Sequence, residues 1–337
     1  MSGRAYISFN PQPAVWEKFV LDHPAGNIFQ SPLIFNLFRS VPTYKPGVIA
    51  FYDGPNRITG ILVYNIIQET GIKKIFTKRS IIIGGPLAEN DNRHIISLLL
   101  LTYKEAVGTE NIIYTQVRNL FPTTNFKPGF CSAGFEYTDH LAIQVDLLKD
   151  ADAIAAGMHK KRWSNIKRAL KKDTQCRELS GDDEMNDAYQ LFLSTYKRIN
   201  LPAPPHALFL NAKSILDKHV YILGAYAGNC LIAARVYLLF KDIIYDWYAC
   251  SNLNYTHLYP NDILPWKAML WAKEKGFRIY DFAGAGHPAK AYGVRDYKIK
   301  FGGELLNYGR YRFIHRPFMH SIGEKGLVFL NYLNIKI

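Results

Sequence analysis

The sequence has little of what marks membrane-spanning, secreted or metal-binding proteins. It has no run of about 18 uncharged apolar residues, the length that a membrane-spanning helix requires, and the longest candidate, Ile95 to Leu101, is much shorter. The first residues, Met1 to Tyr6, lack the apolar core of a signal peptide. The four cysteines are too widely spaced for a disulfide framework or a set of metal ligands. We therefore expect a cytoplasmic protein without a bound metal.

Acidic residues are scarce relative to basic ones, which bears on the partners of the protein. The 337 residues include 41 lysines and arginines against 28 aspartates and glutamates, for a net charge of +13. A surface this basic attracts nucleic acid, phosphorylated metabolites or anionic lipid headgroups, although charge also serves solubility alone. The length suits about two domains, and a hydrophobic content of 48% suits packed cores.

What the sequence does contain is a pattern of strands and helices that occurs twice. In the first half, apolar periodicity and turn residues predict helices over 33–38 and 91–107 and strands over 48–52, 58–67, 81–83, 112–117 and 141–145. In the second half, they predict helices over 182–199 and 261–275 and strands over 220–226, 231–240, 243–249 and 278–282. Tyr52-x-Gly54 and Tyr226-x-Gly228 occupy matching turns, which favours duplication of one mixed αβ unit.

A basic segment from Asp150 to Lys172 separates the two halves. On a helix its lysines share one face while Trp163 and Ile166 share another, so we expect an amphipathic helix with a cationic stripe. The stripe could contact RNA backbone, a substrate diphosphate or anionic lipid, or could remain solvated. The charge density predicts that at least Lys160 or Arg162 contacts an anion. No aromatic ladder accompanies the stripe, so sequence-specific RNA recognition is not expected.

Four stretches, together with the element order helix–strand–strand–strand–helix–strand, resemble a known family. The stretches are His159 to Ala169 (HKKRWSNIKRA), Tyr259 to Leu264 (YPNDIL), Tyr280 to Gly284 (YDFAG) and Gly293 to Gly303 (GVRDYKIKFGG). They are similar to those of the Fem-type (FemABX) peptidoglycan aminoacyltransferases and their relatives with acetyltransferase-like (GNAT-like) domains. The resemblance is strong from about Lys160 to Phe313; before it, Gln30-Ser31 and Gly85-Pro86 are the main anchors.

The resemblance implies an α/β fold with mixed α+β sheets, arranged as tandem GNAT-like domains. We expect an N-terminal domain over residues 1–148, a basic amphipathic linker helix over 149–175, a C-terminal domain over 176–317 and a C-terminal tail over 318–337. Well-known members carry a long helical hairpin in the second domain, and this sequence has no room for one.

The resemblance also implies an activity, aminoacyl transfer from aminoacyl-tRNA to an amino group of a UDP- or lipid-linked muropeptide precursor in cell-wall biogenesis. Aminoacyl-tRNA is then a cosubstrate, and no cofactor is bound. The expected partners are the muropeptide precursor, tRNA and the inner face of the membrane, which the protein contacts peripherally. No stable protein partner is expected.

Lys298 is the first candidate for catalysis. It occupies the family's Phe-Lys position, with Tyr297 in place of the phenylalanine, where a cation can steady a developing oxyanion or a substrate phosphate. By the same resemblance, Glu89 after Gly85-Pro86 holds the place of a candidate base for the proton of the attacking amine. Arg39 is nearest to the place of a phosphate-binding lysine in the first domain.

Asp281 is the third catalytic candidate, because it follows an apolar strand. A carboxylate there can have a raised pKa and act as a base, or it can hydrogen-bond the amides of the loop that follows. His287 and Tyr292 lie in that loop, and we expect them in the substrate cleft. The expected substrate-binding residues are Arg39, Lys160, Arg162, His287, Tyr292 and Tyr297.

Two other functions remain open. One is acetyl-CoA-dependent acylation of an amino sugar or another small amine of surface-polysaccharide synthesis. It predicts a glycine-rich diphosphate clamp after the third strand of the second domain, but the stretch from Cys250 to His257 contains no glycine. The other is a non-catalytic protein that binds a precursor, and the retained Lys298 and Asp281 count against it.

Overall fold

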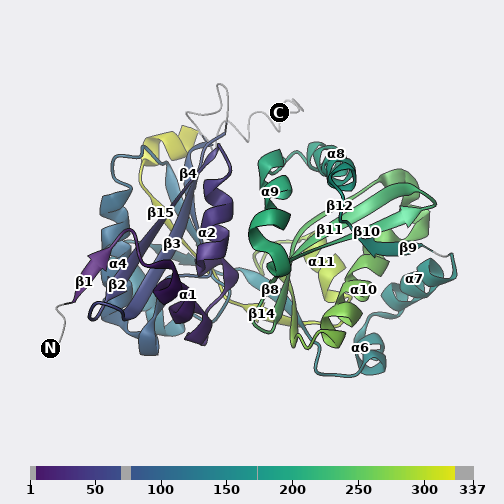
Figure 1. Ribbon diagram of the computed structural model, residues 1–337, viewed down its shortest axis with the longest axis horizontal. Coiled ribbons are helices and arrows are strands. Elements are labelled where there is room, and N and C mark those ends of the chain that lie inside the picture. Colours follow the sequence, from purple (N-terminus) through teal and green to yellow (C-terminus); the bar gives the residue numbers. More distant parts are fainter. Residues whose placement is uncertain (1–4, 70–76, 173, 323–337) are drawn as a thin grey trace. The chain divides into compact units, whose positions relative to one another are not determined.

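The chain folds into two units, each built on its own β-sheet. The computed structural model describes residues 5–69, 77–172 and 174–322. Unit 1 comprises the residues up to Asp139 together with those from Tyr308 onward, and unit 2 comprises His140 to Asn307 (Figure 1). Among the described residues, no helix has the length and apolar character needed to cross a membrane.

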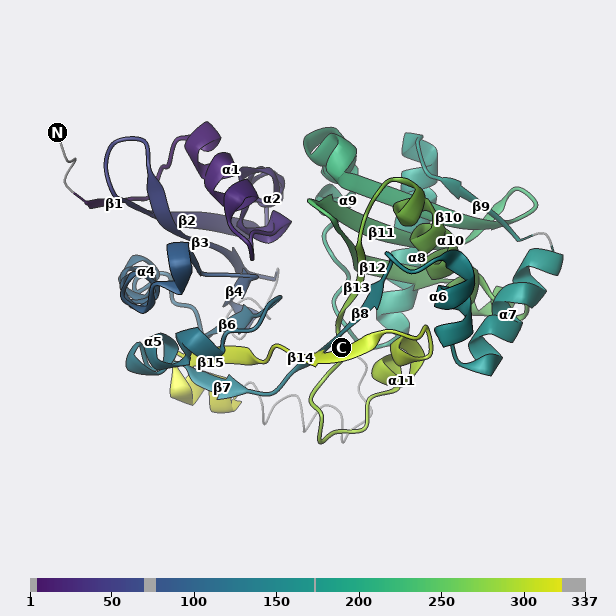
Figure 2. The ribbon, with the colours of Figure 1, turned by 90° about the horizontal axis from the view of Figure 1, so that it is seen from below.

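The sheet of unit 1 has the strand order β1-β2-β3-β4-β6-β15-β7, with β5 paired to β3. The strands are β1 (Tyr6–Ser8), β2 (Tyr44–Tyr52), β3 (Ile58–Ile67), β4 (Arg79–Ile83), β5 (Leu87–Ala88), β6 (Tyr114–Arg118), β7 (Glu136–Thr138) and β15 (Arg310–Ile314). The helices are α1 (Pro13–Asp22), α2 (Pro32–Arg39), α4 (Arg93–Ala106) and α5 (Lys127–Ser132), with 3-10 turns η1 (Ile28–Gln30), η2 (Glu89–Asp91) and η3 (Thr124–Phe126). Helices α1 and α2 cover one face of the sheet and α4 and α5 the other (Figure 2).

The sheet of unit 2 has the strand order β14-β8-β13-β12-β11-β10-β9. The strands are β8 (Leu141–Asp146), β9 (Gln175–Glu178), β10 (Val220–Ala227), β11 (Cys230–Phe240), β12 (Ile243–Ser251), β13 (Ile279–Gly284) and β14 (Glu304–Asn307). The helices are α6 (Ala151–Gly157), α7 (Lys160–Lys171), α8 (Asp182–Arg198), α9 (His206–Leu216), α10 (Pro260–Glu274) and α11 (Gly293–Ile299), with 3-10 helices η4 (Asp217–His219) and η5 (Leu253–Leu258). Helix α7 packs on α10, while α8 packs on β11 and β12 and α9 on β10.

The two sheets share one plan, which confirms the predicted tandem arrangement of mixed αβ units. Each has an antiparallel hairpin, β2–β3 or β10–β11, and each hairpin has a register shift at the matching tyrosine, Tyr52 or Tyr226. Each sheet also has one parallel pair, β4 with β6 or β12 with β13, joined by a long helix. In that helix of unit 1, Asn92 caps the first turn, and Ile96, Leu99 and Tyr103 recur at helical spacing in the core.

The division of the chain differs from the predicted domain boundaries. Strand β8, expected to close the first domain, pairs with β13 and β14 in the sheet of unit 2. Residues 310–314, expected in the second domain, form strand β15, which pairs with β6 and β7 in the sheet of unit 1. The predicted linker helix is part of the unit 2 core, because Ile166 and Ala169 are fully buried there. Strand pairing over long distances cannot be inferred from local periodicity. Most of the predicted tail, from residue 323 onward, lies outside the described residues.

Candidate functional site

The candidate site lies where two parallel strands of unit 2 separate. Strands β12 and β13 pair only from Ile243 and Ile279 to Tyr245 and Asp281. Past that point β12 has a bulge at Trp247. Its neighbours Asp246 and Tyr248 lie opposite residues that are consecutive in β11, so Trp247 is an extra residue without a partner in that strand. Strand β13 therefore continues past Asp281 without β12 beside it. Its carbonyls on that edge require other hydrogen-bond donors.

A buried carboxylate shapes the end of β13. Asp281 is 1% exposed, and its oxygens accept hydrogen bonds from Gln144 Nε2 at 2.9 Å and from the Ala283 amide at 2.6 Å. Ala283 has a φ of +58°, a conformation that is unfavourable for a residue with a Cβ. Burial raises the pKa of Asp281, although both hydrogen bonds oppose the shift. This geometry fits a residue that fixes the loop better than a base open to substrate.

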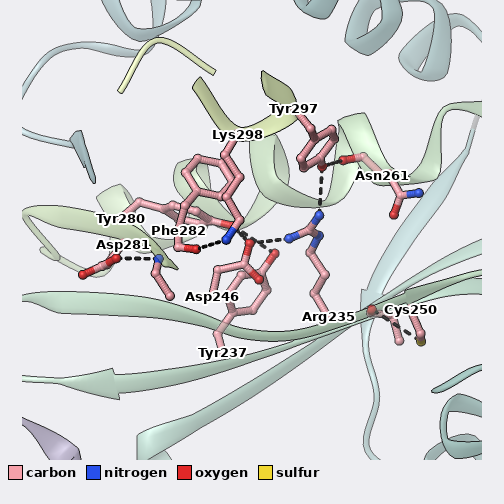
Figure 3. Close-up of polar contacts among 12 residues, drawn as sticks. Arg235, Tyr237, Asp246, Cys250, Asn261, Tyr280, Asp281, Phe282, Tyr297 and Lys298 are labelled. Carbon is pink, nitrogen blue, oxygen red and sulfur yellow. Dashed lines mark hydrogen bonds and ion pairs between the residues drawn. The ribbon is translucent and has the colours of Figure 1, made fainter. Parts of the chain in front are cut away.

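The turn at Ala283 presents two carbonyls to one lysine. Lys298 in α11 donates from Nζ to the carbonyl oxygen of Phe282 at 2.6 Å (Figure 3). It also donates to the carbonyl oxygen of Gly284 at 2.8 Å. An ammonium group has three N–H bonds, so one has no acceptor among the described residues. Burial lowers the pKa of Lys298 from the ordinary value for lysine. A cation fixed by two hydrogen bonds, with a third N–H available, is suited to stabilise a developing oxyanion.

Next to Lys298 lies a buried ion pair between neighbouring strands. Arg235 in β11 pairs with Asp246 in β12, and the two residues are 5% and 8% exposed. The Tyr280 hydroxyl donates to Asp246 at 3.1 Å, and Arg235 Nη2 donates to the Tyr297 hydroxyl at 2.8 Å (Figure 3). The charge of Asp246 also favours the cationic form of Lys298 and so opposes the effect of burial on its pKa. The ion pair thus provides a fixed electrostatic environment for the lysine.

Tyr297 connects this network to α10 and α7. Its hydroxyl donates to the carbonyl of Asn261, and its ring lies 4.4 Å from the Arg162 guanidinium. Arg162 forms an ion pair with Asp262 in the first turn of α10 and donates to the Tyr297 carbonyl at 3.1 Å. Arg162 is only 8% exposed. Its charge is therefore used inside the fold, whereas Lys160, the other residue expected to contact an anion, is exposed, and the expected contact stays a prediction.

The loop between β12 and α10 uses its own amides internally. It forms the 3-10 helix η5, and the Tyr255 amide bonds the Asn252 carbonyl at 3.2 Å. Tyr259 has a φ of +55°, and its carbonyl accepts hydrogen bonds from the amides of Asp262 and Ile263 at 3.0 and 3.1 Å. These amides are not available to wrap a diphosphate. The absence of glycine in the sequence and the geometry of the loop agree on this point.

Three other predicted residues lie elsewhere in unit 2. His287 and Tyr292 are in the loop between β13 and α11, where His287 Nδ1 accepts the Ala289 amide at 3.1 Å and Tyr292 is 40% exposed. Lys160 is exposed at the start of α7. The predicted substrate-binding roles of these residues stay predictions.

The remaining two predicted residues lie in unit 1. Glu89 follows β5 and pairs with Arg57 at 2.8 Å, with 42% of its side chain exposed. Arg39 ends α2, and its guanidinium lies 5.8 Å from the ring centre of Phe35. The roles of Glu89 as a base and of Arg39 as a phosphate contact stay predictions. Within the described ranges, no group of three or more His, Cys, Asp or Glu side chains is placed to hold a metal ion.

Sequence reasoning missed Arg235, Asp246 and Gln144, which complete the network. A usable pattern was present, since Arg235 and Asp246 are isolated opposite charges in two consecutive apolar strands. A charge inside an apolar strand is rarely buried without a partner. Two such charges on neighbouring strands therefore predict a buried pair. Gln144 gave no comparable indication, because its partner lies 137 residues away along the chain.

Replacing Asp281 by alanine is expected to lower the free energy of unfolding by roughly 1–3 kcal/mol, because the Ala283 amide and Gln144 lose their acceptor. Transfer activity should fall as well, since the turn that positions the carbonyls around Lys298 loosens. Urea denaturation measures the first effect. Asp281→Asn, which keeps an acceptor oxygen, should lose less stability. A fully stable but inactive alanine variant would instead indicate that Asp281 acts as a base.

Comparisons with known proteins place the fold of the chain. Residues 160–298 match the family model described as an acetyltransferase (GNAT) domain. The solved structure of FemX is similar over 94% of this chain and 100% of its own, with 14% sequence identity and a TM-score of 0.72. A tandem GNAT protein from the clavulanic acid biosynthesis pathway is similar over 93% of this chain and 99% of its own, with 9% identity and a TM-score of 0.60. L-PGS from Bacillus licheniformis is similar over 98% of both chains, with 13% identity and a TM-score of 0.58.

No curated protein matches the chain in sequence. At identities this low, the solved structures establish the fold, and the family match covers the network around Arg235, Asp246 and Lys298. Residues 160–298 are therefore similar to a GNAT acetyltransferase domain, and the chain is an acyltransferase with the fold of tandem GNAT proteins.

Proposed function

We propose that this acyltransferase moves an amino acid from aminoacyl-tRNA to an amino group of a peptidoglycan precursor. The observation that carries the proposal is the geometry of Lys298, whose amine is fixed on the carbonyls of Phe282 and Gly284 with one N–H left over. In the reaction, the acceptor amine attacks the ester carbonyl of the donor, a C–N bond forms and the ester C–O bond breaks. The proton that the amine loses goes to the departing oxygen, which leaves as the tRNA hydroxyl. The spare N–H of Lys298 stabilises the oxyanion of the tetrahedral intermediate.

The donor is argued from the loop between β12 and α10. Coenzyme A would present a diphosphate, which GNAT-type folds commonly hold on backbone amides near a helix N-terminus. In this chain the Tyr255, Asp262 and Ile263 amides are bonded within the loop and the first turn of α10. An aminoacyl ester of RNA has no such diphosphate and therefore does not require free backbone amides in this loop. The fold shared with FemX and L-PGS supports an aminoacyl donor, without naming the acceptor.

The second candidate is acetyl-CoA-dependent acylation of a small amine such as an amino sugar. The match of residues 160–298 to the acetyltransferase (GNAT) domain model favours it. Side chains rather than amides would then have to hold the diphosphate. Two cations contact this loop and could do so. Arg168 donates to the Tyr259 hydroxyl, and Lys172 donates to the His257 carbonyl.

A product assay separates the two candidates. Purified protein is given a muropeptide precursor with charged tRNA, or amino sugars with acetyl-CoA, and the products are followed by mass. The proposal expects a mass increase of one aminoacyl residue on the precursor, abolished when the tRNA is deacylated beforehand. Transfer from acetyl-CoA alone would overturn the proposal in favour of the second candidate. Lys298→Ala should remove whichever transfer is observed.

A further inference from the structure

The outer surface of α7 is an unusually concentrated row of cations. This helix of 12 residues and the lysine that follows it contain no acidic residue. One of its cations, Arg162, is buried and paired with Asp262. The others are exposed, and none has a carboxylate partner among the described residues: Lys160, Lys161, Lys167, Arg168, Lys171 and Lys172.

The cost of this arrangement suggests that it has a ligand. Like charges at i and i+4 on a helix, such as Lys167 and Lys171, destabilise it by a few tenths of a kcal/mol each. Two exposed arginines elsewhere in unit 2 are paired with carboxylates, Arg177 with Glu184 and Arg278 with Asp242. Helix α7 is held instead by its apolar face, where Ile166 and Ala169 are fully buried. The outer face of α7 is therefore cationic and exposed to solvent.

The buried apolar face also distinguishes between possible ligands. A helix that binds a membrane lays its apolar side into the lipid. In α7 that side is occupied, since Ile166 and Ala169 lie in the core and Trp163 packs on Trp266 with ring centres 5.2 Å apart. Leu170, 45% exposed, is the one large apolar residue of this helix that is exposed. The outer face therefore offers charge without an apolar anchor, which suits a phosphodiester backbone in water better than a lipid surface.

The row of cations also continues to the candidate site. Arg168 Nη1 donates to the Tyr259 hydroxyl at 3.3 Å, and Lys172 Nζ donates to the His257 carbonyl at 2.9 Å. Tyr259 precedes the first turn of α10, where the Asn261 carbonyl accepts the hydroxyl of Tyr297. A polyanion lying along α7 would therefore reach the end of unit 2 at which the network around Lys298 begins.

We propose that α7 binds the phosphate backbone of RNA, without reading its sequence. The helix is on the order of 18 Å long, a length over which an RNA duplex would carry about ten phosphates if its charge spacing is near that of DNA. This inference rests on the proposed function in one respect, because it takes the RNA to be the carrier of the aminoacyl donor. The surface then holds the body of the tRNA while its aminoacyl end reacts near Lys298.

The test compares two variants that lose the same charge at different places. Lys167→Ala with Lys171→Ala removes two outward cations of α7, and Lys197→Ala with Lys275→Ala removes two exposed lysines elsewhere in unit 2. Binding of uncharged tRNA is measured by fluorescence anisotropy over a range of salt concentrations. The α7 variant should bind at least ~5-fold more weakly near 0.1 M salt, with the slope of log affinity against log salt reduced by roughly 2. The control variant should stay within two-fold of the parent.

Transfer assays separate failure of this inference from failure of the proposed function. A short donor, an aminoacyl ester of adenosine, lacks the backbone that α7 would hold. The α7 variant should show a raised KM for full-length aminoacyl-tRNA, with the KM for the short donor changed less than two-fold. Equal tRNA binding by both variants would overturn the role of α7, while transfer by the parent protein would leave the proposed function intact. Parent protein that binds phosphatidylglycerol vesicles but not tRNA would overturn the role of α7 in favour of a lipid surface.

Discussion

Replacing Lys298 by alanine is expected to slow acyl transfer at least ~100-fold, the typical loss when one donor to an oxyanion is removed. The spare N–H and the positive charge disappear together, and the Phe282 and Gly284 carbonyls lose their donor. The rate is measured under saturating substrate, so that the loss appears in kcat. The neighbouring Lys300→Ala is the matched control, because that side chain is exposed, and its rate should be unchanged. An active Lys298→Ala enzyme would remove this residue from the mechanism.

The pH profile tests the same lysine without a mutation. Burial lowers the pKa of Lys298 from its ordinary value of 10.5, so the amine loses its proton at a lower pH than a free lysine does. The working form is the cation, present below the shifted pKa and lost above it. The rate should therefore fall on the alkaline side at a pH under 10.5. A rate that rises through that range would indicate that the neutral amine acts as a base.

Removing Asp246 is expected to have the largest effect on stability. Asp246→Ala leaves the buried Arg235 without a counter-charge, which typically costs about 3–5 kcal/mol of unfolding free energy. The Tyr280 hydroxyl also loses its acceptor. Urea denaturation followed by circular dichroism measures the change.

A surface pair just before the first residues of β12 and β13 provides the control for Asp246. Arg278 and Asp242 lie 3.8 Å apart with 59% and 41% of their side chains exposed, so Asp242→Ala should cost at most ~1 kcal/mol. A double variant, Arg235→Met with Asp246→Leu, should recover part of the lost stability because no charge stays buried alone. Equal costs for Asp242→Ala and Asp246→Ala would show that the buried pair is not important for stability.

Local periodicity was enough to predict most of the longer elements. The strand predicted over 58–67 has those bounds in the structure, and the helix predicted over 182–199 runs from Asp182 to Arg198. Helix α9 was missed, although Leu208, Phe209 and Ala212 are buried at helical spacing. The short strands β9 and β14 were missed as well. Only pairing with distant strands makes such short segments part of a sheet.

The candidate site was predictable only where a motif existed. The resemblance pointed to Lys298. The position of Asp281 after an apolar strand suggested two roles for it, a base or an acceptor of hydrogen bonds from the loop amides. The charge density of the basic segment placed Arg162 among the substrate contacts, although its guanidinium is buried against Asp262. An arginine in a basic stripe has the same sequence pattern whether it faces water or the core. Only the three-dimensional position of Asp262, 100 residues later in the numbering, decides between them.

Strand β15 is the last part of the unit 1 sheet to be made, which has a consequence for synthesis on the ribosome. At ~5–20 residues per second, the intervening segment from His140 to Asn307 takes roughly ten to thirty seconds to produce. During that time β6 has an open edge, and Phe130 lacks the Tyr311 ring that stacks on it at 3.8 Å. Unit 2 can meanwhile complete its sheet from one continuous segment. The unit that is begun first is thus the last to become native.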